Sequence, residues 1–239
     1  LPMKIFPAVH YSMGGLWVDY NQMTEIPGLF AAGECDYSQH GANRLGANSL
    51  LSAIYGGMVA GPNAVKYIKG LKKHAEDLPE TIFEARVKEE TEKWEAILKM
   101  DGTENAYLLH KELGEWITDN MTVVRYNDRL EKTYEKLTEL QERWNNINVN
   151  DTQRWSNQGA HFVRQLKNML YLAKVMTKGA LLRNESRGAH YKPEFPDRDD
   201  ENFLKTTMAK FDPATGEPII TYQEVDVSLI PPRKRDYSA

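Results

Sequence analysis

Apolar residues recur every three or four positions through much of the chain, the spacing that gathers side chains on one face of a helix. Four such stripes are present: Phe83, Val87, Trp94 and Ile97; Ala106, Leu109, Leu113, Trp116 and Ile117; Leu130, Tyr134, Leu137, Leu140 and Trp144; and Phe162, Leu166, Met169, Leu170, Ala173 and Met176. Turn residues over 145–151 separate the last two stripes, and Asp151 is a helix-start signal. Four amphipathic helices joined by short loops predict an antiparallel bundle.

The first 48 residues lack helical spacing and are predicted to form short strands and turns, with an apolar strand in PGLFAAGE (residues 27–34). Asn48 opens a long helical pattern that ends near Gly70, and Pro62 is expected to kink or restart this helix. Small residues predict that a backbone or cofactor packs closely against it: Ala53, Gly56, Gly57, Ala60 and Gly61.

From Ala189 the chain turns to a Pro-rich, extended character, with an edge strand expected in ITYQEVDVSL (residues 220–229) and a polar tail in PPRKRDYSA. The pattern predicts an α+β protein with three regions. Residues 1–70 hold strands, turns and the long helix, residues 71–190 the helical bundle, and residues 191–239 an extended segment with a short strand.

Composition narrows the classes of function. The 239 residues are 41% hydrophobic and 27% charged, as in ordinary globular proteins. The net charge of −4 is too balanced to indicate binding to nucleic acid or to anionic lipid. Cys35, the single cysteine, excludes an internal disulfide and an iron–sulfur cluster held by this chain alone. No apolar run approaches the roughly 20 residues of a membrane-spanning helix, so any membrane association is expected through another subunit.

The candidate chemistry lies in HGANRLGANSLL (residues 40–51), where Arg44 sits in a loop of small residues that runs into the long helix. Small residues let a ligand approach the backbone, and the first turn of a helix carries unpaired N–H groups with a partial positive charge. This loop therefore predicts an anion site. Upstream, His10 ends a short extended run before a glycine pair, and His10 and Arg44 together are suited to hold a dicarboxylate.

These motifs carry a resemblance. HYSMGG, GLFAAGEC and HGANRLGANSLL are similar to the flavoprotein subunit of succinate dehydrogenase and fumarate reductase, and the similarity continues through ESRGAHY to the PRKRDY ending. The resemblance implies an FAD-dependent oxidoreductase that oxidises succinate to fumarate by hydride transfer to the flavin. Electrons are then expected to pass through an iron–sulfur subunit and a membrane cytochrome or anchor subunit to quinone. It also implies a peripheral location on the cytoplasmic face of the cell membrane.

The family's motif positions fall on named residues of this chain. His10 and Arg44 match the pair that binds the dicarboxylate, and Ala47 lies in the same substrate loop where many members have glycine. These three are the expected substrate-binding residues.

Three further positions match the family's cofactor contacts. Glu34 corresponds to the acidic residue that hydrogen-bonds the FAD ribose, while Ser49 and Leu50 correspond to backbone contacts with the flavin's pyrimidine edge. A helix N-terminus at that edge would stabilise the negative charge of a reduced flavin by roughly 0.3–1 kcal/mol.

No GxGxxG fingerprint occurs, although this type of FAD-binding α/β (Rossmann-like) domain uses one to hold the pyrophosphate. The chain is therefore expected to be the C-terminal portion of a longer polypeptide, with the flavin-attachment histidine and the proton-shuttling arginine upstream. No catalytic residue and no metal ligand is assigned in this chain. Alone, it is expected to be inactive and not to retain FAD.

Alternatives remain open. The same site serves fumarate reductase, L-aspartate oxidase has a similar HGANR loop, and a non-enzymatic helical interaction module is a third possibility. Arg44 can also be interpreted as one partner of a structural salt bridge, and Glu34 as a residue that caps the end of a strand.

Outside the anion loop, structural roles are favoured over functional ones. Cys35 is expected to be a small buried side chain, with an exposed reactive thiolate as the alternative, and His40 a hydrogen-bonded structural histidine. Arg183, Arg187 and His190 are interpreted as the basic end of a helix that Gly188 caps.

Overall fold

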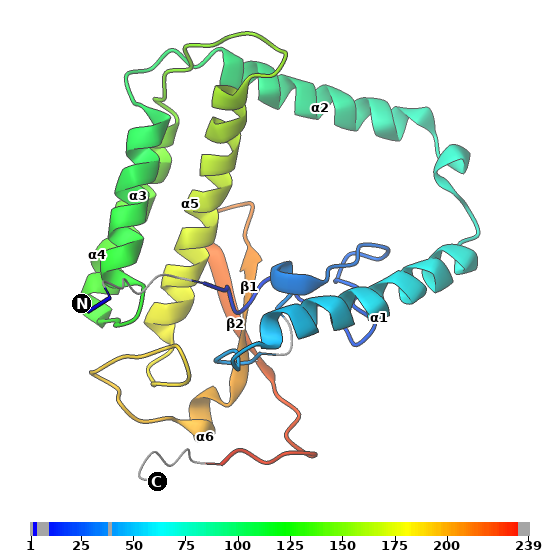
Figure 1. Cartoon of the computed structure of the whole chain (residues 1–239). Coiled ribbons are helices and arrows are strands. Elements are labelled where there is room, and N and C mark those ends of the chain that lie inside the picture. Colours follow the sequence, from blue (N-terminus) through cyan, green and yellow to red (C-terminus); the bar gives the residue numbers. More distant parts are fainter. Residues whose placement is uncertain (1, 4–9, 38–39, 234–239) are drawn as a thin grey trace. The chain divides into compact units, whose positions relative to one another are not determined.

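The computed structural model describes residues 2–3, 10–37 and 40–233 of the chain, and its elements are labelled in Figure 1. The chain forms two compact units. The first extends to Met100 and also includes Val149–Ala160, while the second comprises Asp101–Asn148 and the chain from His161 onward. Both helices and strands are present. The predicted boundaries at residues 70 and 190 stay predictions.

All five helices that apolar spacing predicted are confirmed: α1 (Asn48–Gly70), α2 (Glu80–Leu98), α3 (Ala106–Asn120), α4 (Asn127–Trp144) and α5 (Gln158–Leu182). The antiparallel bundle of four helices stays a prediction, because α2 belongs to the first unit and α3 and α4 belong to the second. Among the described residues, no helix has the length and apolar character needed to span a membrane.

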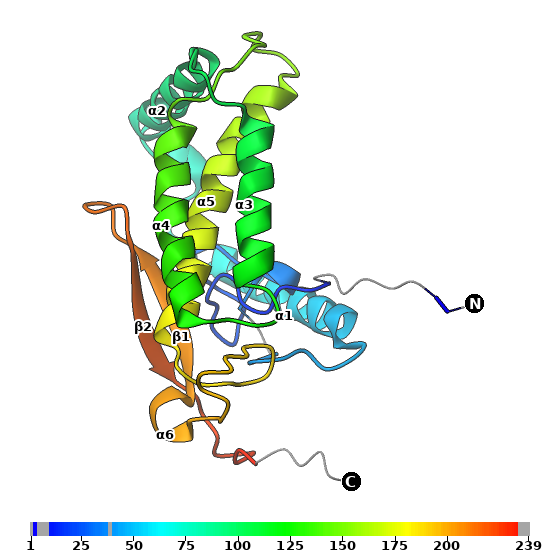
Figure 2. The ribbon, with the colours of Figure 1, turned by 90° about the vertical axis from the view of Figure 1, so that its left-hand side faces the viewer.

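The second unit is built on α3, α4 and α5, which lie side by side in both views (Figures 1 and 2). Leu130, Leu137 and Leu140 of α4 are completely buried. Leu166 and Leu170 supply the buried face of α5. Burial of a leucine side chain contributes about 1.5–3 kcal/mol, so these apolar faces hold the helices together.

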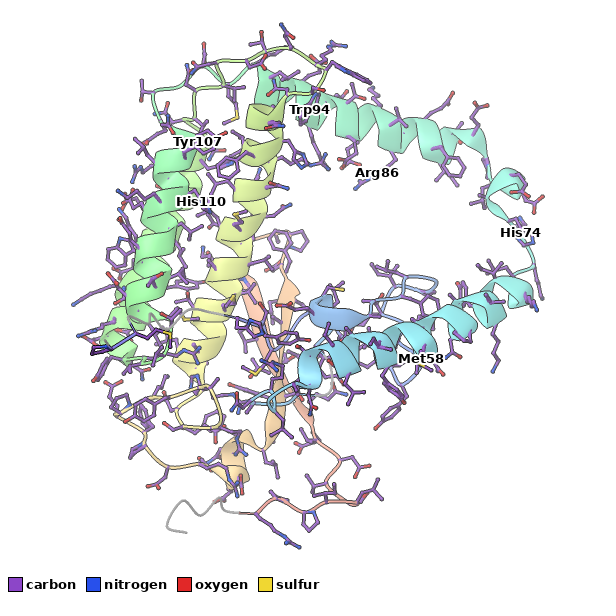
Figure 3. The ribbon with its side chains drawn as sticks, in the orientation of Figure 1. Met58, His74, Arg86, Trp94, Tyr107 and His110 are labelled. Atoms are coloured by element: carbon purple, nitrogen blue, oxygen red, sulfur yellow. The ribbon has the colours of Figure 1, made fainter. Side chains whose placement is uncertain are left out.

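Aromatic stacking adds to the contact between α3 and α5. The rings of Tyr107 and Phe162 are stacked with centroids 4.6 Å apart, and the His110 ring meets Phe162 edge-on at 5.4 Å. Tyr107 and His110 lie on α3 beside the start of α5 (Figure 3).

Side chains cap the starts of α3 and α5. Asn105 Oδ1 accepts hydrogen bonds from the backbone N–H groups of Tyr107 and Leu108 at the start of α3. At the start of α5, Asn157 Oδ1 accepts from the Ala160 N–H at 2.8 Å. The prediction that Asp151 begins this helix is wrong, because its carboxylate accepts from the N–H of Gln153 in the preceding loop.

A two-stranded antiparallel hairpin completes the second unit, with β1 (Lys205–Phe211) paired to β2 (Pro218–Glu224) after the short helix α6 (Asp200–Phe203). The predicted strand over residues 220–229 therefore exists but ends at Glu224, and β1 was not predicted. The hairpin lies along α4 and α5, away from α3 (Figure 2).

In the first unit, α1 runs through Pro62 as one helix and does not restart there. Gly56 is the buried residue of α1, and a Cβ at this position would lie 3.3 Å from the Cβ of Ala32. Close packing at Gly56 is therefore confirmed. At Gly57 and Gly61 a Cβ would meet nothing within 4 Å in the described part of the chain, so close packing by a cofactor at these two positions stays a prediction.

The segment before α1 holds isolated bridges in place of strands. Leu16 bridges Asp36 in parallel, Met23 bridges Phe30 in antiparallel, and a 3-10 helix, η1, spans Gly33–Cys35. The predicted strand over residues 27–34 is thus reduced to the bridge at Phe30, since a strand persists only with neighbours to accept its hydrogen bonds. No α/β sheet occurs in the first unit among the described residues.

Candidate functional site

Two segments that lie far apart in the sequence meet in the first unit. The backbone N–H of Arg44 donates to Met13 Sδ at 2.8 Å, across 31 residues. The Arg44 guanidinium carbon lies 5.3 Å from the centroid of the Tyr11 ring, a cation–π contact. The Tyr11 ring also meets the His40 ring edge-on, with centroids 5.2 Å apart. The HYSM segment and the HGANR loop therefore form one site.

Arg44 is half-buried, and its side chain donates one hydrogen bond, to the Leu45 carbonyl at 3.1 Å. Within the part of the chain that the structure describes, no carboxylate forms an ion pair with this guanidinium. The alternative that Arg44 forms a structural salt bridge has no support among the described residues. A guanidinium has five N–H donors in a planar fork, so Arg44 retains donors for an anionic ligand.

His10 is exposed and directly precedes Tyr11, the residue whose ring contacts Arg44. The extended run that was predicted to lead into His10 falls on residues 4–9, outside the described residues. The substrate-binding role of His10 stays a prediction.

His40 ties the loop to the helix that follows it. Its Nε2 lies 2.9 Å from Ser52 Oγ, and that hydroxyl donates to the Ser49 carbonyl at 2.9 Å. The prediction of a hydrogen-bonded histidine is confirmed. Because His40 also contacts Tyr11, one imidazole links the aromatic ring to the first turn of α1.

The start of α1 is open to a ligand. Ala47, at the N-cap, has a left-handed backbone with φ 63° and makes no side-chain capping hydrogen bond. Ser49 is half-buried, and Leu50 is 74% exposed. The first N–H groups of a helix have no acceptor within the helix and depend on a cap. Since Ala47 supplies no side-chain acceptor, the first turn of α1 has no side-chain cap.

Glu34 lies in η1, where its Oε1 accepts a hydrogen bond from the Ser12 N–H at 2.8 Å. The neighbouring Cys35 is exposed, and its Sγ lies 3.3 Å from the Ala32 carbonyl, so the prediction of a buried thiol is wrong. The reason is that Cys35 lies in the three-residue 3-10 helix η1, which has no buried residue. Gly15 packs directly on this turn, and a Cβ on it would collide with the Cys35 carbonyl.

Sequence reasoning missed two polar residues that pair within the segment before α1. Gln22 and Asp36 are both buried, and in the amide orientation that satisfies both groups the Gln22 nitrogen donates to Asp36 Oδ2 at 2.9 Å. Sequence reasoning also missed Tyr11, whose only signal was its place directly after His10.

Comparisons with known proteins identify the family. Residues 110–237 match the family described as fumarate reductase flavoprotein C-term, and residues 2–50 match an FAD binding domain. The chain belongs to the succinate dehydrogenase and fumarate reductase flavoprotein family. The match supports FAD as the cofactor of the full-length flavoprotein.

Individual relatives support the same family. It is 71% identical over 238 residues to the succinate dehydrogenase flavoprotein subunit of Bacillus subtilis, covering 100% of this chain and 41% of the relative. The fumarate reductase flavoprotein subunit of Haemophilus influenzae is 36% identical, with 100% of this chain and 39% of the relative covered. The chain therefore spans about two fifths of the length of these relatives.

Solved structures in the same family have similar folds. A variant of Escherichia coli quinol fumarate reductase FrdA matches with a TM-score of 0.88 and 36% identity, covering 94% of this chain and 38% of that chain. Mycobacterium smegmatis Sdh1 in complex with UQ1 matches with a TM-score of 0.78 and 30% identity, covering 94% and 36%.

The start of α1 has the chemistry that a flavin's negatively charged edge requires. The Asn48 N–H donates to the Leu45 carbonyl at 3.2 Å, whereas no side-chain cap from Ala47 competes for the N–H groups that follow at Ser49 and Leu50. Glu34 is exposed, as a carboxylate that binds a ribose must be before the cofactor arrives. The individual roles of Glu34, Ser49 and Leu50 stay predictions.

The second basic cluster of the flavoprotein is structural, but the predicted cap is wrong. α5 ends at Leu182, and Gly188 with φ 59° lies in a tight turn where Arg187 and His190 exchange backbone hydrogen bonds at 2.8 and 3.0 Å. Arg183 donates to the Phe203 and Lys205 carbonyls, so it fixes the entry into β1.

A half-buried histidine, His190, and a fully buried lysine, Lys192, lie beside this turn. His190 Nε2 lies 2.9 Å from the Arg183 carbonyl and its Nδ1 lies 2.6 Å from a nitrogen of Arg125, which fits the neutral imidazole. Burial lowers the pKa of His190 from 6.5 to about 4, and the charge of Arg125 acts in the same direction. Burial likewise lowers the pKa of Lys192 to about 8, although three oxygens accept from its ammonium.

Proposed function

We propose that this chain supplies the dicarboxylate clamp and the helical region of an FAD-dependent succinate dehydrogenase flavoprotein that oxidises succinate to fumarate. The observation that carries the proposal is the contact of Arg44 with Tyr11 and Met13, which joins the HYSM segment to the HGANR loop. This contact leaves the guanidinium without a carboxylate partner among the described residues.

The residues act by binding and alignment. Arg44 binds one carboxylate of succinate through two parallel hydrogen bonds, and His10 binds the other carboxylate. FAD, when bound, accepts the hydride from the substrate. The N–H groups at the start of α1 donate to the flavin's pyrimidine edge and stabilise negative charge there. We assign the transfer of the proton to no residue of this chain.

The partners are proposed from the family to which the chain belongs. We propose that electrons leave the flavin through an iron–sulfur subunit and a membrane anchor subunit to quinone. The flavoprotein would then be held peripherally at the cytoplasmic face of the membrane by these partners. Residues 1–239 alone would give no turnover.

The test is Arg44→Ala in the full-length flavoprotein. Removing an arginine that pairs with a bound carboxylate costs roughly 2–5 kcal/mol, so succinate oxidation with an artificial electron acceptor should fall at least about 30-fold in kcat/KM. Arg86→Ala is the matched control, because Arg86 is exposed on α2 and its ion pairs with Glu89 and Glu90 lie on the surface (Figure 3). Near-normal succinate oxidation by Arg44→Ala would contradict the proposal.

Fumarate reduction is the second candidate, because the same clamp binds fumarate. The 71% identity to a succinate dehydrogenase subunit, against 36% to a fumarate reductase subunit, favours succinate oxidation. L-aspartate oxidase activity is a further alternative. Comparing turnover of succinate and of L-aspartate by the full-length protein separates it from the dehydrogenase.

A further inference from the structure

Tyr11 carries a buried hydroxyl that the proposed clamp does not yet use. Its oxygen is shielded from solvent and has no hydrogen-bond partner among the described residues. Buried polar groups in native proteins are nearly always paired, so an unpaired hydroxyl in a binding region points to a missing ligand group.

The ring that bears this hydroxyl is fixed on two sides. The Arg44 guanidinium lies over the ring at 5.3 Å and the His40 ring meets it edge-on at 5.2 Å. The next two residues are held as well, because the Ser12 backbone N–H donates to Glu34 and the Met13 side-chain Sδ accepts from the Arg44 N–H. The ring therefore stays against the guanidinium, and the hydroxyl that it carries belongs to the same site.

The chemistry of a carboxylate suits both groups. A carboxylate has about four lone-pair sites, and a bidentate arginine uses two of them. A neutral phenol can donate to a third site and adds no charge. It cannot bind an anion alone, but it can strengthen and orient one that an arginine holds.

We propose that Tyr11 is a substrate-positioning residue: its ring orients the Arg44 guanidinium, and its hydroxyl donates a hydrogen bond to the carboxylate that Arg44 binds. This inference rests on the proposed dicarboxylate site. It adds a third protein group to the clamp of His10 and Arg44.

The test uses Tyr11→Phe in the full-length flavoprotein, which keeps the ring and removes the hydroxyl. Malonate is the probe, and its dissociation constant is read from a titration of the flavin absorbance. A hydrogen bond to a charged group accounts for about a tenfold or larger change, so the dissociation constant should rise about tenfold or more. The flavin content and the spectrum without malonate should stay as in the wild type.

Tyr11→Leu removes the ring as well and should weaken malonate binding further than Tyr11→Phe does. Tyr20→Phe is the matched control, because Tyr20 is 96% exposed and should bind malonate as the wild type does. A Tyr11→Phe dissociation constant within twofold of the wild type would overturn the inference. Loss of bound flavin in Tyr11→Phe would also overturn it, since that result indicates a merely structural role.

Arg44→Lys separates the two proposals. If Arg44→Lys weakens malonate binding and Tyr11→Phe does not, the dicarboxylate site stands and the role of Tyr11 is wrong. If neither change affects malonate binding, the proposed site itself is wrong.

Discussion

Glu185 illustrates how single residues stabilise the second unit. Its side chain is fully buried and accepts hydrogen bonds from Arg183, Arg187 and the Asp199 backbone. A buried carboxylate persists only when such donors compensate its lost hydration. Arg183 and Arg187 therefore neutralise and hold this one carboxylate, and they are not available as an anion site.

His190 predicts how stability depends on pH at this residue scale. Its pKa in the folded chain is about 4 against 6.5 ordinarily, so between these values the unfolded chain binds a proton that the folded chain does not. The free energy of unfolding should therefore fall as pH falls, by about 1–2 kcal/mol between pH 6.5 and 5. His190→Gln should remove this part of the dependence, measured by denaturant unfolding at a series of pH values.

His161→Gln is the control for this experiment, because His161 is exposed at the start of α5. It should keep the pH dependence of the wild type. Carboxylates titrate mostly below this window and confound the comparison little. A His190→Gln profile that parallels the wild type between pH 6.5 and 5 would contradict the assignment.

At this scale the sequence predicted residues with local signals better than residues with distant partners. Arg44 and His40 stand in a small-residue loop before a helix, so their surroundings could be inferred from neighbours in the chain. The buried state of Lys192 could not, because Asn127, one of its three acceptors, lies 65 residues away. Tyr11 was missed for the same reason.

The β1–β2 hairpin shows what holds one element to others. Glu217, just before β2, accepts from the Tyr134 hydroxyl of α4 and from Lys174 Nζ of α5, the latter at 2.6 Å. The Lys174 side chain is only 3% exposed. The ammonium is therefore nearly dehydrated, and the Glu217 carboxylate is the anion that pairs with it.

Glu217→Gln should lower the free energy of unfolding by about 2–3 kcal/mol, because it leaves a buried ammonium without an anion. Thermal or denaturant unfolding measures the change. Glu224→Gln is the matched control, since Glu224 pairs with Lys205 while 81% exposed, and its effect should stay below about 0.5 kcal/mol. Equal effects of the two changes would contradict the role of Glu217.

Helices were predictable at the element scale, and strands were not. In α3, α4 and α5 the apolar spacing can be seen within the helix's own sequence, and the backbone hydrogen bonds join residues of the same helix. The β1 strand, in contrast, depends on β2 for its pairing, and its sequence KTTMAKF has no clear apolar alternation. The bridge at Phe30 likewise depends on its partner Met23.

At the scale of the whole molecule, the two units differ in how much apolar surface they bury. Most fully buried leucines belong to the second unit, whereas the α1 helix of the first unit exposes a series of large apolar side chains: Leu50, Leu51, Ile54, Tyr55, Met58, Val65 and Ile68. Met58, for example, is 70% exposed and projects from α1 (Figure 3). Burial supplies most of the stability of a helix in a protein, so the two units should differ in local stability.

Hydrogen exchange of the 239-residue chain should detect this difference. Backbone amides of α1 should exchange at least about tenfold faster than those of α4, because few buried contacts resist the opening of α1. Mass spectrometry of peptides from the two helices gives the rates. Equal protection of α1 and α4 would show that exposed side chains do not govern local stability here.

The division into two units could not be inferred from the sequence. Residues 149–160 return to the first unit after α3 and α4, which lie in the second. Local patterns report which segments are helical, but they carry no record of which distant segments pack together. The domain boundaries predicted at residues 70 and 190 therefore stay predictions.

Gly15 limits how this region can change. Its backbone crosses the turn at Cys35 so closely that any side chain would wedge the two segments apart. Such a wedge would disturb η1, the short turn that carries Glu34. Residues in the flanking loops can therefore change to give new ligand preferences. Position 15, in contrast, has room only for the hydrogen atom of a glycine.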